Sequence, residues 1–221
     1  MKKSTAIILA VLVVLSTVSG IWLLVFPSLE RQHNLDVQAE MIERIEKGNV
    51  KPVSEPPKDK TPDKEPAPII IDIPEPTKEP VPIGTELGIL TYERLNMKLP
   101  VVEGVAEELI KSAVGHVPET AAIGDVGNAV ILGHRSYTYG LHFNRLGEAE
   151  IGDIIGYTSA DGESCLFEVF EIIEIEPTDQ IAFVQPTDES IITLYTCTPI
   201  YEATHRLLVR AEIINELEEC Y

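Results

Sequence analysis

From residue 84 to residue 214, apolar and polar side chains alternate in short runs that are bounded by glycine, proline or polar residues. A period of two is typical of β-strands, because successive side chains of a strand point to opposite faces. The alternation predicts eight strands, at residues 86–91, 97–102, 113–117, 128–133, 153–158, 165–175, 191–197 and 206–214. Many short strands separated by turn signals favour an all-β sandwich or a closed barrel, and periodicity alone does not choose between the two.

Short helical stretches interrupt this pattern. Residues 105–112 predict one short helix, and residues 141–146 predict a single helical turn.

The N-terminal part of the chain follows a different pattern. Residues 6–26 are almost entirely apolar, and a helix of that length covers the hydrocarbon core of a bilayer. Lys2 and Lys3 precede the run, which favours a cytoplasmic N-terminus and places the rest of the chain outside the cell. Pro27 is expected to break this helix or to mark its exit from the membrane. The alternative is a cleaved signal peptide with small residues at 17–19, but the apolar run extends beyond the usual length of such a segment.

Between the apolar run and the strands lie two polar segments. Residues 29–47 predict a polar helix with a thin apolar stripe, which either packs on the folded domain or continues the anchor as a stalk, and the stalk is preferred. Residues 48–82 hold ten of the sixteen prolines of the chain, a composition typical of an extended spacer. The predicted organisation is an anchor at 1–28, a helix and proline-rich stalk at 29–83, and a folded domain at 84–221.

Charge narrows the range of partners. The chain has a net charge of −19, and the segment from Gly84 onward contributes 7 − 24 = −17 of it. Such an acidic surface repels nucleic acid and gains nothing from anionic lipid headgroups, so neither is expected as a partner of the domain. The spacing of its cysteines and histidines does not suggest a metal site, and no glycine-rich phosphate loop is present, so no cofactor is expected.

The last two predicted strands bring a thiol and a guanidinium together. Cys197 ends the first strand and Arg206 begins the second, and only residues 198–205 separate them, so the strands are expected to pair antiparallel. A fixed positive charge beside a thiol lowers the pKa of the thiol or stabilises an oxyanion formed nearby. Arg210 shares the face of Arg206 and is expected to form a salt bridge instead. Cys165 lies inside another strand, and a disulfide between Cys165 and Cys220 is a minor alternative.

A proton carrier is then needed, and the chain offers His33, His116, His134, His142 and His205. His134 is the best candidate because it follows the buried-looking run NAVILG at 128–133, where a strand opens into a loop. His205 is its rival, but strand alternation turns His205 away from the face of Arg206. His116 and His142 have no evident partner and are expected to be structural.

Three blocks of sequence carry a resemblance to a known family. They are GNAVILGHR at 127–135, TLYTC at 193–197 and HRLLVRA at 205–211, and together they resemble the signature of the sortases. The segments LPVVEG at 99–104, VGHVPETAAIGDVGN at 114–128 and IGD at 151–153 are also similar to the sortase core. The resemblance covers about residues 84–214. Sortases are cysteine transpeptidases of the Gram-positive cell surface.

The resemblance implies a fold and a reaction. The fold would be the eight-stranded sortase barrel, with Cys197 as nucleophile, His134 as general acid and base, and Arg206 holding the substrate carbonyl or the oxyanion. The enzyme would cleave an LPXTG-like sorting motif between Thr and Gly through a thioester, and transfer the acyl group to an amine of a cell-wall precursor or a pilin lysine. It would act outside the cell, held in the membrane by its N-terminal helix.

Further details of the resemblance remain open. The linker between the predicted strands at 165–175 and 191–197, residues 176–189, would form part of the groove that recognises the sorting peptide. Residues 69–73 either lie against the domain or cover its groove, but they do not match the Asp-Pro-aromatic lid motif of pilus-building sortases. The sequence therefore leaves class C-like and class D-like sortases both open.

Two other functions are weighed against this one. A stalked acidic β-domain that binds a protein without catalysis would not need the intact Cys, His and Arg blocks. A hydrolytic cysteine protease of the papain type places its nucleophile early in the chain with the histidine far downstream, which is the opposite of the order here.

Overall fold

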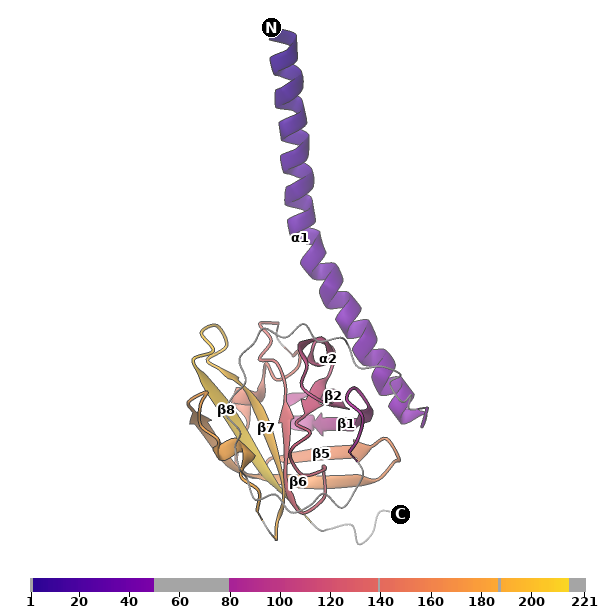
Figure 1. Cartoon of the computed structure of the whole chain (residues 1–221), viewed down its shortest axis with the longest axis vertical. Coiled ribbons are helices and arrows are strands. Elements are labelled where there is room, and N and C mark those ends of the chain that lie inside the picture. Colours follow the sequence, from indigo (N-terminus) through magenta and orange to yellow (C-terminus); the bar gives the residue numbers. More distant parts are fainter. Residues whose placement is uncertain (1, 50–79, 139, 187, 215–221) are drawn as a thin grey trace.

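Eight strands close into a barrel in the computed structural model, which describes residues 2–49, 80–138, 140–186 and 188–214 (Figure 1). Around the barrel the strands follow the order β1-β2-β3-β4-β7-β8-β6-β5, and β5 pairs with β1 to complete the circle. In chain order they are β1 (Glu86–Tyr92), β2 (Met97–Glu103), β3 (Val114–His116), β4 (Gly127–Leu132), β5 (Ile154–Ser159), β6 (Ser164–Ile175), β7 (Ser190–Thr198) and β8 (His205–Ile213). The eight predicted strands are confirmed, and the closed barrel is the correct one of the two architectures.

Most strand pairs are antiparallel, but two pairs are parallel, and these determine which strand ends lie at the same rim of the barrel. β2 pairs with β3 in parallel, and β4 pairs with β7 in parallel, with Leu132 opposite Tyr195. Since β4 and β7 run in the same direction, their C-terminal ends lie at the same rim of the barrel. β8 returns antiparallel to β7 and therefore starts at that rim.

The interior of the barrel is filled by the inward side chains of these alternating strands. Leu194 on β7 and Val209 on β8 are fully buried there, together with Phe143 from the loop after β4. Close packing of such a layer is the main contribution to stability, because each buried side chain leaves water and contacts several others. The alternation that predicted the strands also predicted which face is buried.

Two helices lie outside the barrel. α2 (Glu107–Ile110) is a single turn between β2 and β3, shorter than the predicted helix, and a 3₁₀ turn at Leu146–Glu148 follows the predicted helical turn at 141–146. α1 (Lys2–Glu46) is one continuous helix that bends part-way along (Figure 1). It passes through Pro27, so the expectation that this proline breaks the helix is wrong. A proline inside a helix removes one hydrogen bond, and a bend is its usual consequence.

The last turns of α1 pack on the barrel. Met41 is buried against Val102 of β2 and Ala113. The guanidinium of Arg44 forms an ion pair with the carboxylate of Glu86 on β1 at 2.5 Å. Lys98 of β2 forms an ion pair with Glu46 at 2.6 Å. The C-terminal part of the helix therefore packs on the folded domain, which is the less favoured of the two arrangements that the sequence predicted.

Several predictions concern residues outside this description. The side chains of residues 2–11, 21, 23, 24 and 27 are not described, so the predicted membrane span at 6–26 falls partly among them. Within the described residues, no helix is both long enough and apolar enough to cross a membrane. Most of the proline-rich spacer, the patch at 69–73 and Cys220 also lie outside the described residues.

Candidate active site

Cys197 lies at the rim of the barrel directly opposite Arg206. The register of β7 and β8 pairs these two residues, as the sequence predicted. Cys197 is half-buried on the outer face of the sheet, whereas its neighbour Thr196 is buried and donates its hydroxyl to the carbonyl of Gly133 at 2.8 Å. The thiol is therefore accessible while the backbone that carries it is fixed.

His134 follows the C-terminal end of β4 and therefore lies at the same rim. The parallel pairing of β4 with β7 continues past the last strand residue, because Gly133 donates its backbone N–H to the carbonyl of Tyr195 at 3.1 Å. The carbonyl of His134 then accepts the N–H of Phe143 at 3.1 Å, which closes the following loop. A side chain at Gly133 would lie 2.6 Å from the ring of Phe143, so only glycine permits this approach. His134 is held at the loop start by both contacts.

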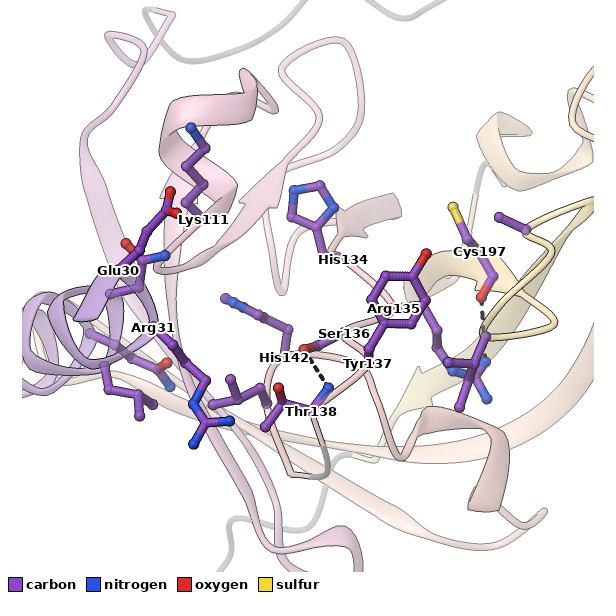
Figure 2. A pocket seen from close by; sticks show the side chains of 16 residues that line it. Glu30, Arg31, Lys111, His134, Arg135, Ser136, Tyr137, Thr138, His142 and Cys197 are labelled. Carbon is purple, nitrogen blue, oxygen red and sulfur yellow. Dashed lines mark hydrogen bonds between the residues drawn. The ribbon is translucent and has the colours of Figure 1, made fainter. Parts of the chain in front are cut away.

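The two residues line one cavity of about 510 Å³ (Figure 2). Cys197 lies on one side of it, and the side chains of Lys111 and of α1 lie on the other, with His134 between them. At the outer rim, the exposed rings of Tyr137 and Tyr201 stack with their centroids 5.6 Å apart, joining the loop after β4 to the loop between β7 and β8. The cavity is thus open, lined by a thiol and an imidazole, and large enough for part of a peptide.

Burial favours the neutral form of the histidine in this cavity. It lowers the pKa of His134, the carboxylate of Glu107 opposes that shift, and the charge of Lys111 adds to it. Burial also lowers the pKa of His142, whose ring lies edge-on to His134 at 6.4 Å. A neutral imidazole near pH 7 can accept a proton, which is what a general base requires.

Two substitutions next to His134 are expected to move its pKa in opposite directions. Lys111→Gln removes a like charge and should raise the pKa of His134, while Glu107→Gln removes an opposite charge and should lower it. The ring-proton signal of His134, followed by NMR across pH 4–8, measures both shifts. Equal shifts of the same sign in the two variants would contradict this electrostatic description.

Two arginines lie near Cys197, and their heads bind backbone carbonyls. Arg135 follows His134 and donates to the carbonyls of Asn144 at 3.1 Å and Cys197 at 3.5 Å. Burial lowers its pKa, and Glu174 and the Cys197 thiol oppose that shift. Arg206 donates to the carbonyls of Ala203 at 3.1 Å and His205 at 3.0 Å, and it is not among the residues that line the cavity. The structure therefore brings His134 and Cys197 together in one cavity, and Arg206 beside Cys197 through strand register.

The rival residues have other partners. Arg210 forms an ion pair with Glu171 at 2.5 Å, as expected. His205 lies 3.3 Å from Glu176 and is partly exposed. His116 is buried between Glu103, at 2.9 Å, and the carbonyl of Ala121, at 2.8 Å, and is structural as predicted.

The surroundings of the other described thiol, Cys165, do not favour its reactive thiolate form. Cys165 is free in the structure, and burial raises its pKa to about 11. Its proposed disulfide partner, Cys220, lies outside the described residues.

Sequence reasoning missed part of the cavity wall. His142 was expected to be structural, but it lines the cavity, and its buried Nδ1 has no hydrogen-bond partner among the described residues. Glu30 and Arg31 of α1 also line it, although that helix was expected to be a stalk. Only the apolar stripe of α1 hinted that the helix packs on the domain. For Arg135, its place directly after His134 was the available signal.

The expectation that the segment at 176–189 forms part of the groove for the sorting peptide stays a prediction. The segment starts beside His205, and its 3₁₀ turn at Ile181–Phe183 buries Ala182 against Ile175 and Leu208 on the outer face of the barrel. None of its described residues lines the cavity.

The architecture and the cavity together define a thiol–imidazole site on a closed β-barrel, and comparison with known proteins identifies its family. Residues 90–214 match the family model for the sortase domain, so the chain belongs to the sortase family. Sortases are cysteine transpeptidases.

Individual relatives agree with this assignment. The chain is 31% identical to Sortase D of Bacillus subtilis over 118 residues, which are 52% of this chain and 56% of that protein. It is 25% identical to Sortase SrtE1 of Streptomyces coelicolor over 148 residues, which are 60% of this chain and 42% of that protein. The chain thus spans about half the length of these curated relatives. The crystal structure of sortase C1 from Streptococcus agalactiae is similar at a TM-score of 0.55 and 28% identity, over 57% of this chain and 66% of that one.

Proposed function

We propose that the protein is a transpeptidase that cleaves an LPXTG-like sorting motif and transfers its acyl part to an amine. The observation that carries this proposal is the placement of an accessible thiol, Cys197, and an imidazole, His134, on one cavity by two neighbouring parallel strands of a sortase domain.

The steps follow from the groups in the cavity. His134 takes the proton of the Cys197 thiol as the sulfur attacks the carbonyl between Thr and Gly of the motif. The C–N bond then breaks, and His134 gives this proton to the departing amine. A thioester then links the acyl part to Cys197. An incoming amine attacks this thioester, the C–S bond breaks as a new amide forms, and the proton from the nitrogen passes through His134 to the thiolate. Water can replace the amine, which gives hydrolysis.

Arg206 is proposed to stabilise the negative oxygen that forms on the attacked carbonyl, because a guanidinium carries positive charge and several N–H donors. In the structure its head binds carbonyls of its own loop, so it has to turn toward Cys197 when substrate binds.

Arg206→Ala is expected to lower kcat by about 10²–10³-fold, the usual effect of removing one donor to an oxyanion. Arg210→Ala is the matched control, because Arg210 shares the same face but binds Glu171 and lies over the ring of Phe170 at 5.2 Å. It should lower the free energy of unfolding by about 1 kcal/mol and leave kcat nearly unchanged. Steady-state kinetics and thermal unfolding of the two variants make the comparison, and equal losses of kcat would contradict the assignment.

The location of the enzyme is part of the proposal. Residues 6–26 would hold it in the membrane, with Lys2 and Lys3 on the cytoplasmic side and the barrel outside the cell. The continuous α1 supports this arrangement, because the helix that carries the apolar run also rests on the barrel. The substrates would be surface proteins or pilins that bear the sorting motif, and the amine would come from a cell-wall precursor or a pilin lysine.

Product analysis tests the proposed reaction. The full chain is incubated with peptides that contain variants of the LPXTG motif, with and without a primary amine, and the products are identified by mass spectrometry. The proposal predicts cleavage after Thr in both cases and an amide product when the amine is present. Absence of cleavage across a panel of motifs would contradict it, and hydrolysis that the amine never diverts would indicate a hydrolase.

A further inference from the structure

The positive side chains of this acidic protein fall into two groups. Six of those that the structure describes form ion pairs with carboxylates, and they lie on α1, the barrel wall and the loops: Arg44, Lys47, Arg94, Lys98, Arg145 and Arg210. In a chain with a net charge of −19, such pairing is the expected state of a surface cation.

The remaining cations with described side chains gather at the candidate active site. Arg135 and Arg206 donate to backbone carbonyls, and Arg206 also interacts with the side chain of Tyr195. Arg31 of α1 and Lys111, which follows α2, line the cavity, and neither has a carboxylate within ion-pair distance among the described residues. The site is therefore the one region where positive charge is left without a negative partner in the described part of the protein. Unpaired cations that face a cavity favour an anionic group of a ligand.

The order of the elements around the barrel rim shows which reacting group lies on the side of the cavity that carries Arg31 and Lys111. Around the barrel, β1, β2, β3, β4 and β7 are neighbours in that order, and α1 packs on β1 and β2. Lys111 precedes β3, His134 follows β4, and Cys197 lies near the end of β7. His134 therefore lies between Cys197 and the wall that carries Arg31 and Lys111, as Figure 2 shows. The group that exchanges protons with His134 is the amine, so the space on this side belongs to the amine and whatever is attached to it.

The cavity wall also carries a carboxylate and a buried polar atom without a hydrogen-bond partner among the described residues. Glu30 is next to Arg31 on the cavity side of α1, and the buried Nδ1 of His142 is left without a partner. An acceptor that carries a carboxylate in addition to its amine can pair this carboxylate with Arg31 and Lys111, whereas a simple alkyl amine has no group that binds these two cations.

We propose that the acceptor is an amino-acid or peptide amine that carries a free carboxylate, and that Arg31 and Lys111 bind this carboxylate while the amine faces His134. The inference rests on the proposed transpeptidation and adds the chemical class of the acceptor. In the step concerned, the acceptor nitrogen bonds to the thioester carbonyl, the bond from carbon to the Cys197 sulfur breaks, and the proton of the nitrogen passes through His134 to that sulfur.

The test compares two acceptors that differ only in the carboxylate. The full chain is loaded with an LPXTG-like peptide, and the rate of amide formation is measured with increasing glycylglycine or glycylglycinamide at fixed pH. The ratio of the two kcat/KM values is compared between wild type and Arg31→Gln/Lys111→Gln. Because both acceptors react at the same thioester, this ratio is insensitive to any change in the pKa of His134.

The proposal predicts about a five-fold preference of the wild type for glycylglycine, which corresponds to two partly exposed ion pairs and which added salt reduces. The double variant should lose this preference. Because Lys111→Gln also shifts the pKa of His134, thioester formation is compared on the pH plateau of each protein, where the double variant should match the wild type. Lys47→Gln is the matched control, because Lys47 directly follows α1 and pairs with Glu43, and neither residue lines the cavity. This variant should keep the preference.

The outcomes separate this inference from the proposed function. Equal use of the two acceptors by the wild type, or an unchanged preference in the double variant, would overturn the assignment of the carboxylate. Slower thioester formation in the double variant on its own pH plateau, with a raised KM for the peptide, would show that the two cations bind the sorting peptide instead. If no thioester forms with any motif, the proposed function itself fails, and the acceptor site fails with it.

Discussion

Cys197→Ala is expected to lower the transpeptidation rate by about 10⁴-fold or more, because Cys197 is the one thiol among the described residues that line the cavity. The substitution removes one half-buried sulfur on the outer face of β7, so the barrel should stay folded. Peptide cleavage followed by chromatography measures the loss, and the thermal unfolding midpoint shows that the fold is retained.

Cys165→Ala is the matched control for the nucleophile. Cys165 is also a free, half-buried thiol in a strand, but burial raises its pKa to about 11 and it lies outside the cavity. This variant should retain activity close to that of the wild type. If it lost activity while Cys197→Ala retained it, the nucleophile would be assigned to the wrong strand.

His134→Gln is expected to lower the rate of both half-reactions by about 10²–10⁴-fold, the usual contribution of a general acid and base. Glutamine is polar and similar in size but cannot exchange a proton near neutrality. In the wild type, the rate should fall on the acid side with an apparent pKa below the ordinary value of histidine, since burial lowers the pKa of His134. Pre-steady-state kinetics across pH 4–8 measure both effects.

His205→Gln distinguishes His134 from its rival. His205 adjoins Arg206 in the chain but lies 3.3 Å from Glu176, partly exposed and outside the cavity. Its substitution should change the rate less than about two-fold, as expected of a surface position. A loss as large as that of His134→Gln would contradict the choice between the two histidines.

The features that depend on local pattern were predictable from the sequence. The alternation along residues 191–197 and 206–214 predicted both strands, their antiparallel pairing and the apposition of Cys197 with Arg206, because side-chain period and a short connection fix these properties together. The approach of His134 to Cys197 was different, since it depends on the parallel pairing of β4 with β7 across more than fifty intervening residues. Only the family resemblance indicated it.

The features that depend on distant packing were not predictable in this way. The apolar stripe of α1 fits both a free stalk and a docked helix, and only the buried contacts of Met41 with Val102 and Ala113 select the docked one. The role of Arg31 and His142 in the cavity wall follows from that docking and from the loop after β4. The direction of the Arg206 head is a choice among rotamers, which no sequence pattern encodes.

The central claim is that the sulfur of Cys197 carries the acyl group of the substrate. Intact-protein mass spectrometry of the full chain, mixed with an LPXTG-like peptide in the absence of amine, tests it most directly. The account predicts a mass gain equal to the peptide up to and including Thr, located on Cys197 by fragmentation and released by hydroxylamine. An adduct on another residue, or no adduct while the peptide is consumed, would contradict the account.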